Sequence, residues 1–205
     1  MEIDIKEKEI EIREKELTAL DYFILDFVEN LEGLIDYVIV GGYVPVLFGR
    51  CRGTEDIDIL IQDISEEKFK KFLKRIKGKY ELLIPDDMEK AFRDLKQGNP
   101  IRFCRKGIIV PNAELRIAKT DYQKYSLKNA LKIKFGGKTI KVSPIEMQIA
   151  YKLFTNDRHD QMDARFLFKL LRRYINIEVL RKLIEDLKID RQVTKEVLGE
   201  DIWKE

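Results

Sequence analysis

The segment GGYVPVLFGRCRGTEDIDILI, residues 41–61, constrains the fold of this chain more than any other part of the sequence. Asp56 and Asp58 stand two positions apart within an apolar run, and such a run predicts a buried strand. Alternate side chains of a strand share one face, so both carboxylates are expected to project together. Two neighbouring carboxylates repel each other unless a cation lies between them. We therefore expect this pair to bind a divalent cation that prefers oxygen ligands, with Mg²⁺ as the first candidate.

A second strand is expected just upstream, over residues 37–40, and it leads into Gly41 and Gly42. A short helix should follow, with Pro45 near its first turn, where the missing amide hydrogen costs little. Glycines let a backbone approach a ligand closely, and the free amides at a helix start attract phosphate oxygens. Phosphates at the glycines and metal at the aspartates would describe a nucleoside triphosphate site. Taken singly, the glycine pair could be a plain turn and the aspartates could be solvated acids.

In this order and spacing, the residues resemble the signature of the DNA polymerase beta-like nucleotidyltransferase superfamily. Two glycines, thirteen further residues and then Asp-Ile-Asp carry the resemblance. The local form RGTEDID, residues 52–58, is similar to the minimal branch of that superfamily, which includes nucleotidyltransferase toxins of abortive-infection, toxin–antitoxin systems. The resemblance extends more weakly to about residue 170. It implies an α/β (α+β) fold, with a mixed β-sheet core flanked by helices and a helical carboxyl-terminal part.

The resemblance implies a third carboxylate on a strand next to the two aspartates. Glu114 is the candidate, because it stands in a short strand-like run after Pro111, and Asp121 is the second choice. With Asp56 and Asp58, Glu114 would form a catalytic and metal-binding set for two Mg²⁺ ions. Many relatives carry Asp at the third position, so Glu departs from the pattern. Glu114 could instead pair with Arg116 or another surface base.

The resemblance also suggests residues that bind the triphosphate. Gly41 and Gly42 are the first of these, and Thr54 could donate a hydrogen bond to a phosphate. Arg52 could contact the nucleotide or serve as a structural clamp of the loop. All four residues precede Asp56 and Asp58 in the sequence.

A second part of the resemblance lies between residues 143 and 167. Lys152-Leu153, Arg158, Asp160 and Asp163 follow the order of a family pattern, although the linker between them is shorter than expected. Lys152 would meet the triphosphate, as a lysine point charge can. Asp163 or Asp160 would orient the lysine or stabilise the packing. The alternative is an ordinary amphipathic helix with a solvated lysine.

The charge is distributed unevenly along the 205 residues. From Arg116 to Lys182 there are sixteen Lys or Arg against six Asp or Glu, so the rest of the chain carries about −8 within a total of +2. A basic second half facing an acidic metal site suits an anionic partner such as a nucleotide or RNA. The alternative is a solvated surface of mixed charge. His159 is the only histidine, which argues against a zinc site or a histidine-based triad.

The remaining composition bears on location and domains. Cys51 and Cys104 have no metal-ligand spacing and fit free thiols in a reducing compartment. The charged amino terminus does not resemble a signal peptide and no segment is long enough for a membrane span, so a cytoplasmic protein without membrane contact is expected. Three parts are predicted: a charged extension over 1–17, the nucleotidyltransferase core over 18–142 and a helical subdomain over 143–205. For the extension, a helix, a strand and a frayed tail all remain open.

Hydrophobic periodicity and turn residues predict the elements in outline. Helices are expected over 18–32, 65–76, 86–97, 145–154, 160–174 and 178–187, the second of them capped by Ser65. Further strands are expected over 80–84, 101–104, 107–110, 114–118, 131–135 and 138–142. The last two should form a hairpin through Gly136 and Gly137.

Three functions remain open at this point. The first is an enzyme that transfers a nucleoside monophosphate from a triphosphate to a hydroxyl group of RNA or of protein. By family analogy, transfer RNA is the preferred acceptor, and the enzyme would be a toxin with an antitoxin partner. A small-molecule acceptor is less favoured. The second is a catalytically idle nucleotidyltransferase fold that senses nucleotides or binds RNA or a protein partner. The third is a plain RNA-binding protein, whose affinity would be metal-independent and steeply dependent on salt.

Overall fold

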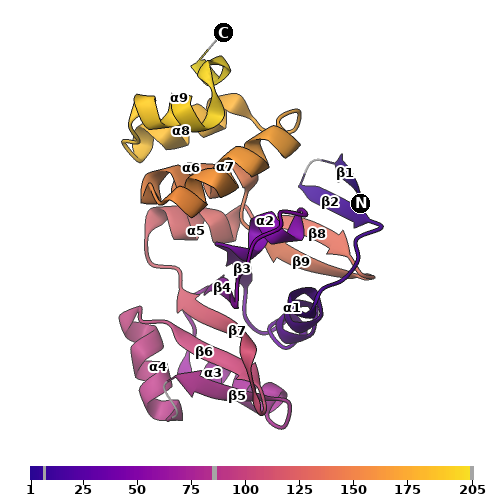
Figure 1. Ribbon diagram of the computed structural model, residues 1–205. Helices are drawn as coiled ribbons and strands as arrows, with labels where there is room; N and C mark the ends of the chain where they lie inside the picture. The colour runs from indigo at the N-terminus through magenta and orange to yellow at the C-terminus, as the bar shows by residue number, and fades with distance from the viewer. Residues whose placement is uncertain (7, 85–86, 204–205) are drawn as a thin grey trace.

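The computed structural model describes residues 1–6, 8–84 and 87–203, which form a mixed β-sheet with helices packed against it (Figure 1). The sheet order is β1-β2-β8-β9-β3-β4-β7-β6-β5. The strands are β1 (Glu2–Lys6), β2 (Glu9–Arg13), β3 (Tyr37–Val40), β4 (Asp56–Ile61), β5 (Tyr80–Ile84), β6 (Ile101–Arg105), β7 (Ile108–Ile117), β8 (Leu131–Phe135) and β9 (Lys138–Val142). The helices are α1 (Ala19–Glu29), α2 (Tyr43–Leu47), α3 (Glu66–Ile76), α4 (Met88–Gln97), α5 (Asp121–Lys128), α6 (Ile145–Thr155), α7 (Arg158–Leu171), α8 (Ile177–Asp186) and α9 (Arg191–Leu198), followed by a 3₁₀ turn (Glu200–Trp203).

The centre of the sheet follows from the apolar run around the two aspartates. Strand β4 pairs antiparallel with β3 and parallel with β7. Its isoleucines at 57, 59 and 61 are buried, and they belong to the same hydrophobic core as an aromatic cluster to which α1, α3 and β5 contribute. Within that cluster the Phe27 ring lies 5.1 Å from Tyr80 and 6.0 Å from Phe72. The opposite face of β4 is thereby left to Asp56 and Asp58.

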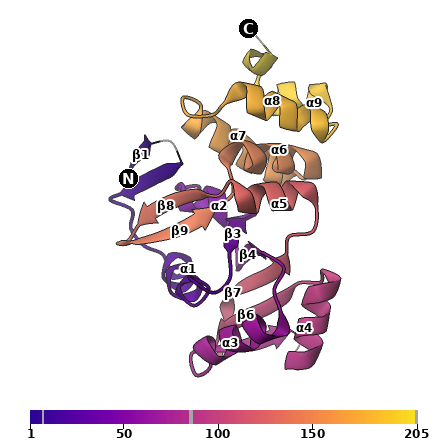
Figure 2. The same ribbon diagram turned by 180° about the vertical axis from the view of Figure 1, so that it is seen from behind.

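The helices of the carboxyl-terminal part stack at one end of the molecule. Figures 1 and 2 show α6 to α9 beyond α5, with α3 and α4 at the opposite end. From residue 145 to 203 the chain is helical apart from its turns. Within the described ranges, no helix is both long and apolar enough to cross a membrane.

Most of the predicted elements are present. The helix capped by Ser65 is α3, with the Ser65 side chain accepting from the Lys68 amide. The hairpin through Gly136 and Gly137 joins β8 and β9. The first helix begins after Thr18, whose side chain forms a capping box with Asp21. Residue 86, the expected start of another helix, lies outside the described residues, and α4 begins at Met88.

One feature that the sequence left open is now defined, and two others differ from the sequence expectations. Residues 1–17, for which helix, strand and tail were open, contain the hairpin β1–β2, and β2 pairs in parallel with β8. The strands expected over 107–110 and 114–118 are one continuous strand, β7. Pro111 is accommodated within it because the pairing with β6 shifts register between Cys104 and Arg105, and prolines occur at such irregularities. Helices α5 and α9 were not predicted.

Candidate active site

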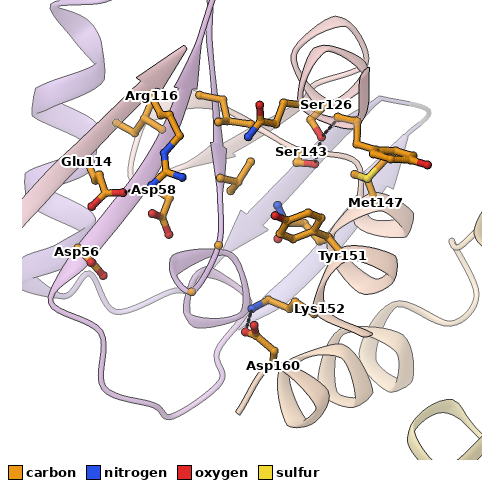
Figure 3. A pocket seen from close by; sticks show the side chains of 18 of the residues that line it. Asp56, Asp58, Glu114, Arg116, Ser126, Ser143, Met147, Tyr151, Lys152 and Asp160 are labelled. Carbon is orange, nitrogen blue, oxygen red and sulfur yellow. Dashed lines mark hydrogen bonds and ion pairs between the residues drawn. The ribbon is translucent and has the colours of Figure 1, made fainter. Parts of the chain in front are cut away.

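Asp56 and Asp58 lie on the wall of a cavity of about 370 Å³ (Figure 3). The glycine pair that follows β3 lines the same cavity. Glu114 lines the same cavity, and the parallel pairing of β4 with β7 places it directly beside Asp58. The predicted set of three carboxylates is therefore gathered on one face of two neighbouring strands. The register brings them together because 56, 58 and 114 all occupy the face that the isoleucines leave free.

Gly41 lies against one of the two aspartates. Its φ is +73°, and a Cβ added there would lie 3.0 Å from Cγ of Asp58 and closer still to its Oδ2. A Cβ on Gly42 would lie 3.2 Å from an Nη2 atom of Arg52. The glycines were predicted to let phosphate approach, whereas the neighbours seen in the structure are the Asp58 carboxylate and the Arg52 guanidinium.

Asp58 has the most perturbed carboxyl group of the site. Burial, together with the charges of Asp56 and Glu114, raises the pKa of Asp58 from an ordinary value of 3.8 to about 6, against the opposing charges of Arg116 and Lys152. The ionised form is thus unfavourable in the protein alone. A cation between the aspartates would relieve that cost.

This shift predicts a pH-dependent gain in stability on replacing Asp58 by Asn in the presence of a chelator. Because the folded-state pKa lies above the unfolded one, ionisation destabilises the fold above about pH 6 and has no effect below about pH 4. We expect Asp58→Asn to raise the free energy of unfolding by ~1–3 kcal/mol at pH 8, and to leave it unchanged at pH 4. Urea denaturation at the two pH values measures both numbers. An equal change at both pH values would contradict the assignment.

Glu114 is held by arginines on either side. Its Oε2 accepts from Nε and Nη2 of Arg102 at 2.9 and 2.7 Å, and its Oε1 accepts from Nη2 of Arg116 at 2.7 Å. The predicted alternative, a pairing of Glu114 with Arg116, is therefore present, although Glu114 also lies next to Asp58.

Asp121, the second choice for the third carboxylate, begins α5 and is exposed, and it is not among the residues that line the cavity. The described part of the chain contains no group of three His, Cys, Asp or Glu side chains arranged to hold a metal ion.

Across the cavity from the carboxylates lies a buried ion network. The Lys152 ammonium is 2.8 Å from Oδ2 of Asp163 and 2.7 Å from Oδ1 of Asp160. Arg50 and Arg52 also pair with Asp163, which is fully buried. Burial lowers the pKa of Lys152, and its hydrogen bond with Asp160 opposes that shift. Three cations against two carboxylates leave one net positive charge, so this side of the cavity suits an anion.

The network also has a large expected effect on stability. Replacing Asp163 by Asn would leave Lys152 and two arginines without their shared buried partner, which typically costs ~3–5 kcal/mol. The matched control is Asp63→Asn, whose pair with Lys96 is exposed on both sides, and exposed pairs contribute about 0–1 kcal/mol. Chemical denaturation of the two variants and the wild type measures the difference. Equal effects of the two substitutions would show that Asp163 is not the centre of the network.

The remaining predicted residue, Thr54, lines the cavity and orients an aspartate. Its Oγ1 donates to the Asp56 main-chain oxygen at 3.1 Å and lies 3.3 Å from Oδ1 of Asp56.

Arg50 and Arg102 were not predicted as part of the site. Nor were the residues that α5 and the start of α6 add to the cavity wall, which include Tyr122, Ser126 and Gln148. The capping box of Thr120 and Gln123 is the sequence signal that could have revealed α5.

The comparisons with known proteins bear on the fold. No protein-family model matches this sequence, and no curated protein matches it. An antigenic nucleotidyltransferase-like protein from Paracoccidioides brasiliensis aligns over 86% of this chain and 90% of its own, with a TM-score of 0.51 and 18% sequence identity. A putative nucleotidyltransferase from Helicobacter pylori covers 93% of this chain and 85% of its own, with a TM-score of 0.49 and 18% identity. JHP933 from Helicobacter pylori covers 89% and 80%, with a TM-score of 0.48 and 18% identity.

The likeness to the Paracoccidioides protein confirms the predicted fold class. The chain has a mixed α/β fold of the nucleotidyltransferase-like kind, with a mixed sheet at its core and helices around it.

Proposed function

We propose that this protein is a Mg²⁺-dependent nucleotidyltransferase that transfers a nucleoside monophosphate from a triphosphate to a hydroxyl group. The observation that carries the proposal is the pairing of Asp56 and Asp58 on one wall of a cavity with the cationic network of Arg52 and Lys152 on the other. Carboxylates suit a metal ion and the cations suit a polyphosphate, which are the two parts of a metal–nucleotide substrate.

The donor set fits magnesium at the two aspartates. Mg²⁺ is usually held by one or two carboxylates, with waters and substrate phosphates as its other ligands, so Asp56 and Asp58 suffice on the protein side. When bound, one or two such ions neutralise charge on the phosphate oxygens and promote ionisation of the attacking hydroxyl. Glu114 already accepts three hydrogen bonds from Arg102 and Arg116, so it would become a further ligand through the remaining lone pair of Oε1 or by giving up one of these bonds.

The protein's own residues supply mainly position and charge. Lys152 and Arg52 would bind the β- and γ-phosphates, while Gly41 leaves room for Asp58 beside the α-phosphate. The acceptor oxygen bonds to the α-phosphorus, the bond to the bridging oxygen breaks, and pyrophosphate leaves while the hydroxyl proton passes to solvent. Catalysis of this kind rests on positioning and on electrostatic stabilisation.

RNA is the acceptor class that the charge distribution favours. The surplus of Lys and Arg between residues 116 and 182 would attract a phosphate backbone. Transfer RNA, a protein acceptor, a role as a toxin and an antitoxin partner are supported only by the resemblance of RGTEDID, residues 52–58, to the minimal branch.

A second function is favoured by the environment of Glu114. Since both of its oxygens accept from arginines, the site would serve equally as a catalytically idle nucleotide sensor. Such a protein would bind a metal–nucleotide complex and release it unchanged.

The test is transfer of α-labelled ATP, GTP, CTP and UTP, each supplied separately with Mg²⁺, to total RNA and to the protein itself. We expect label from at least one triphosphate in the RNA fraction, and none when a chelator replaces Mg²⁺. Nucleotide binding without any transfer would support the sensor function instead. An RNA affinity that depends on neither the metal ion nor the nucleotide would favour the plain RNA-binding protein.

A further inference from the structure

The cavity extends along helix α6 beyond the ion network. Gln148, Tyr151 and Lys152 all line it, as residues spaced by three and four on one helical face can. Lys152 is turned toward Asp160, and Tyr151 lies beside it at the cavity (Figure 3). Gln148 is one helical turn further toward the start of α6, about 6 Å along the axis. A ligand with its anionic end at Lys152 would therefore place its next part against Gln148 and Tyr151.

The side chain of Gln148 lines the cavity, and its amide has no protein partner in the described part of the chain. It is only 5% exposed, and its amide forms no hydrogen bond with any residue that the structure describes. Its nitrogen and oxygen are not among the enclosed side-chain atoms that lack a partner, so they are open to the cavity, where water or a ligand satisfies them. Because this amide lines the cavity, a bound molecule can supply the missing donor and acceptor.

The cavity wall beyond the ion network combines apolar side chains with polar ones. Leu60 and Met147 form part of the wall, and the hydroxyls of Ser126 and Ser143 are bonded to each other at 3.0 Å. The Tyr151 side chain is about half exposed, and its ring packs against Phe154 with 5.9 Å between centroids. Apolar walls with a few placed polar groups are typical of small-molecule sites. This composition suits a planar heteroaromatic ring with a hydrogen-bonding edge.

We propose that this half of the cavity is a nucleobase subsite, in which the Gln148 amide reads the base edge and the Tyr151 ring covers the base face. A glutamine amide presents a donor and an acceptor side by side, which matches the paired acceptor and donor on an edge of adenine and comparable pairs on other bases. Aromatic stacking adds affinity for any base. The inference rests on the proposed function, since that proposal places the triphosphate at Lys152.

The test is equilibrium binding of the four nucleoside triphosphates in the presence of Mg²⁺, with inorganic tripolyphosphate as the probe of the phosphate half alone. We expect the wild type to prefer one base by about tenfold or more, a discrimination typical of an amide–base pair. In Gln148→Leu the preference should fall to about threefold or less, while tripolyphosphate affinity stays unchanged. Tyr151→Ala should weaken binding of all four triphosphates and leave tripolyphosphate binding unaltered.

Two features keep the test interpretable. Leucine has a similar size to glutamine and removes only an unpartnered amide, so the fold should tolerate it. The matched control is Gln97→Leu, an exposed position at the end of α4 that does not line the cavity, and it should leave every affinity unchanged.

Each outcome separates the two proposals. Equal binding of all four triphosphates by the wild type, or a preference that survives Gln148→Leu, would overturn the base subsite. The expected preference without any nucleotidyl transfer would leave the subsite in place and refute the enzyme. Absence of all triphosphate binding would overturn both.

Discussion

Asp58→Asn is expected to abolish nucleotidyl transfer and to leave the protein folded. The substitution keeps the shape of the side chain and removes half of the charge that Asp56 and Asp58 present to a metal ion. Metal ions typically supply several kcal/mol of transition-state stabilisation, so the rate should fall by about a thousandfold or more. Initial rates of label transfer at saturating triphosphate measure the loss.

The control for this substitution is Asp63→Asn, two residues beyond the end of the same strand. Asp63 is exposed and pairs with Lys96, so its removal should change neither the rate nor the metal dependence. An Asp58→Asn variant with a rate close to that of the wild type would mean that the aspartate pair is not the metal site. Because Asp58→Asn is expected to stabilise the metal-free protein above pH 6, unfolding cannot account for the loss of activity.

Gly41→Ala is expected to disable the site in a different way. The new Cβ would collide with the Asp58 carboxylate, which must shift from its present position. A misplacement of about 1 Å in a reacting assembly can cost a hundredfold in rate, so we expect at least that loss. Stability should fall as well, by ~1–2 kcal/mol for the left-handed backbone alone.

Gly107→Ala is the control that introduces the same backbone strain without a collision of the new Cβ. Gly107 has the same φ of +73° and no atom within 4 Å of an added Cβ, and it lies in the turn between β6 and β7. Its replacement should cost similar backbone strain and leave transfer unchanged. If the two alanine variants lose activity equally, the close approach of Gly41 to Asp58 has no role in the site.

The parts of the site that the sequence predicted are those set by local pattern. The apolar run determines which face of β4 carries the two aspartates. The position of the two glycines was predicted because they come directly after the neighbouring strand. Glu114 was predicted beside them because its own strand-like run was visible. In each case the residues that decide the position are only a few places away in the sequence.

The contacts that the sequence did not predict join residues that lie far apart in the chain. Arg52 and Asp163 are 111 residues apart and meet only when α7 packs near the loop before β4. Arg102 reaches Glu114 because β6 pairs with β7, and no sequence spacing indicates which carboxylate an arginine will choose. The amino-terminal hairpin is different, since the alternating isoleucines of EIDIK and EIEIR were a readable strand pattern.

The most direct test of the central claim compares two labelled forms of the preferred triphosphate, one labelled at the α-phosphate and one at the γ-phosphate. Nucleotidyl transfer predicts that the acceptor gains the α label and none of the γ label, and that Asp58→Asn transfers neither. Transfer of the γ label would identify a kinase and contradict the account. So would α-label transfer that persists unchanged in Asp58→Asn.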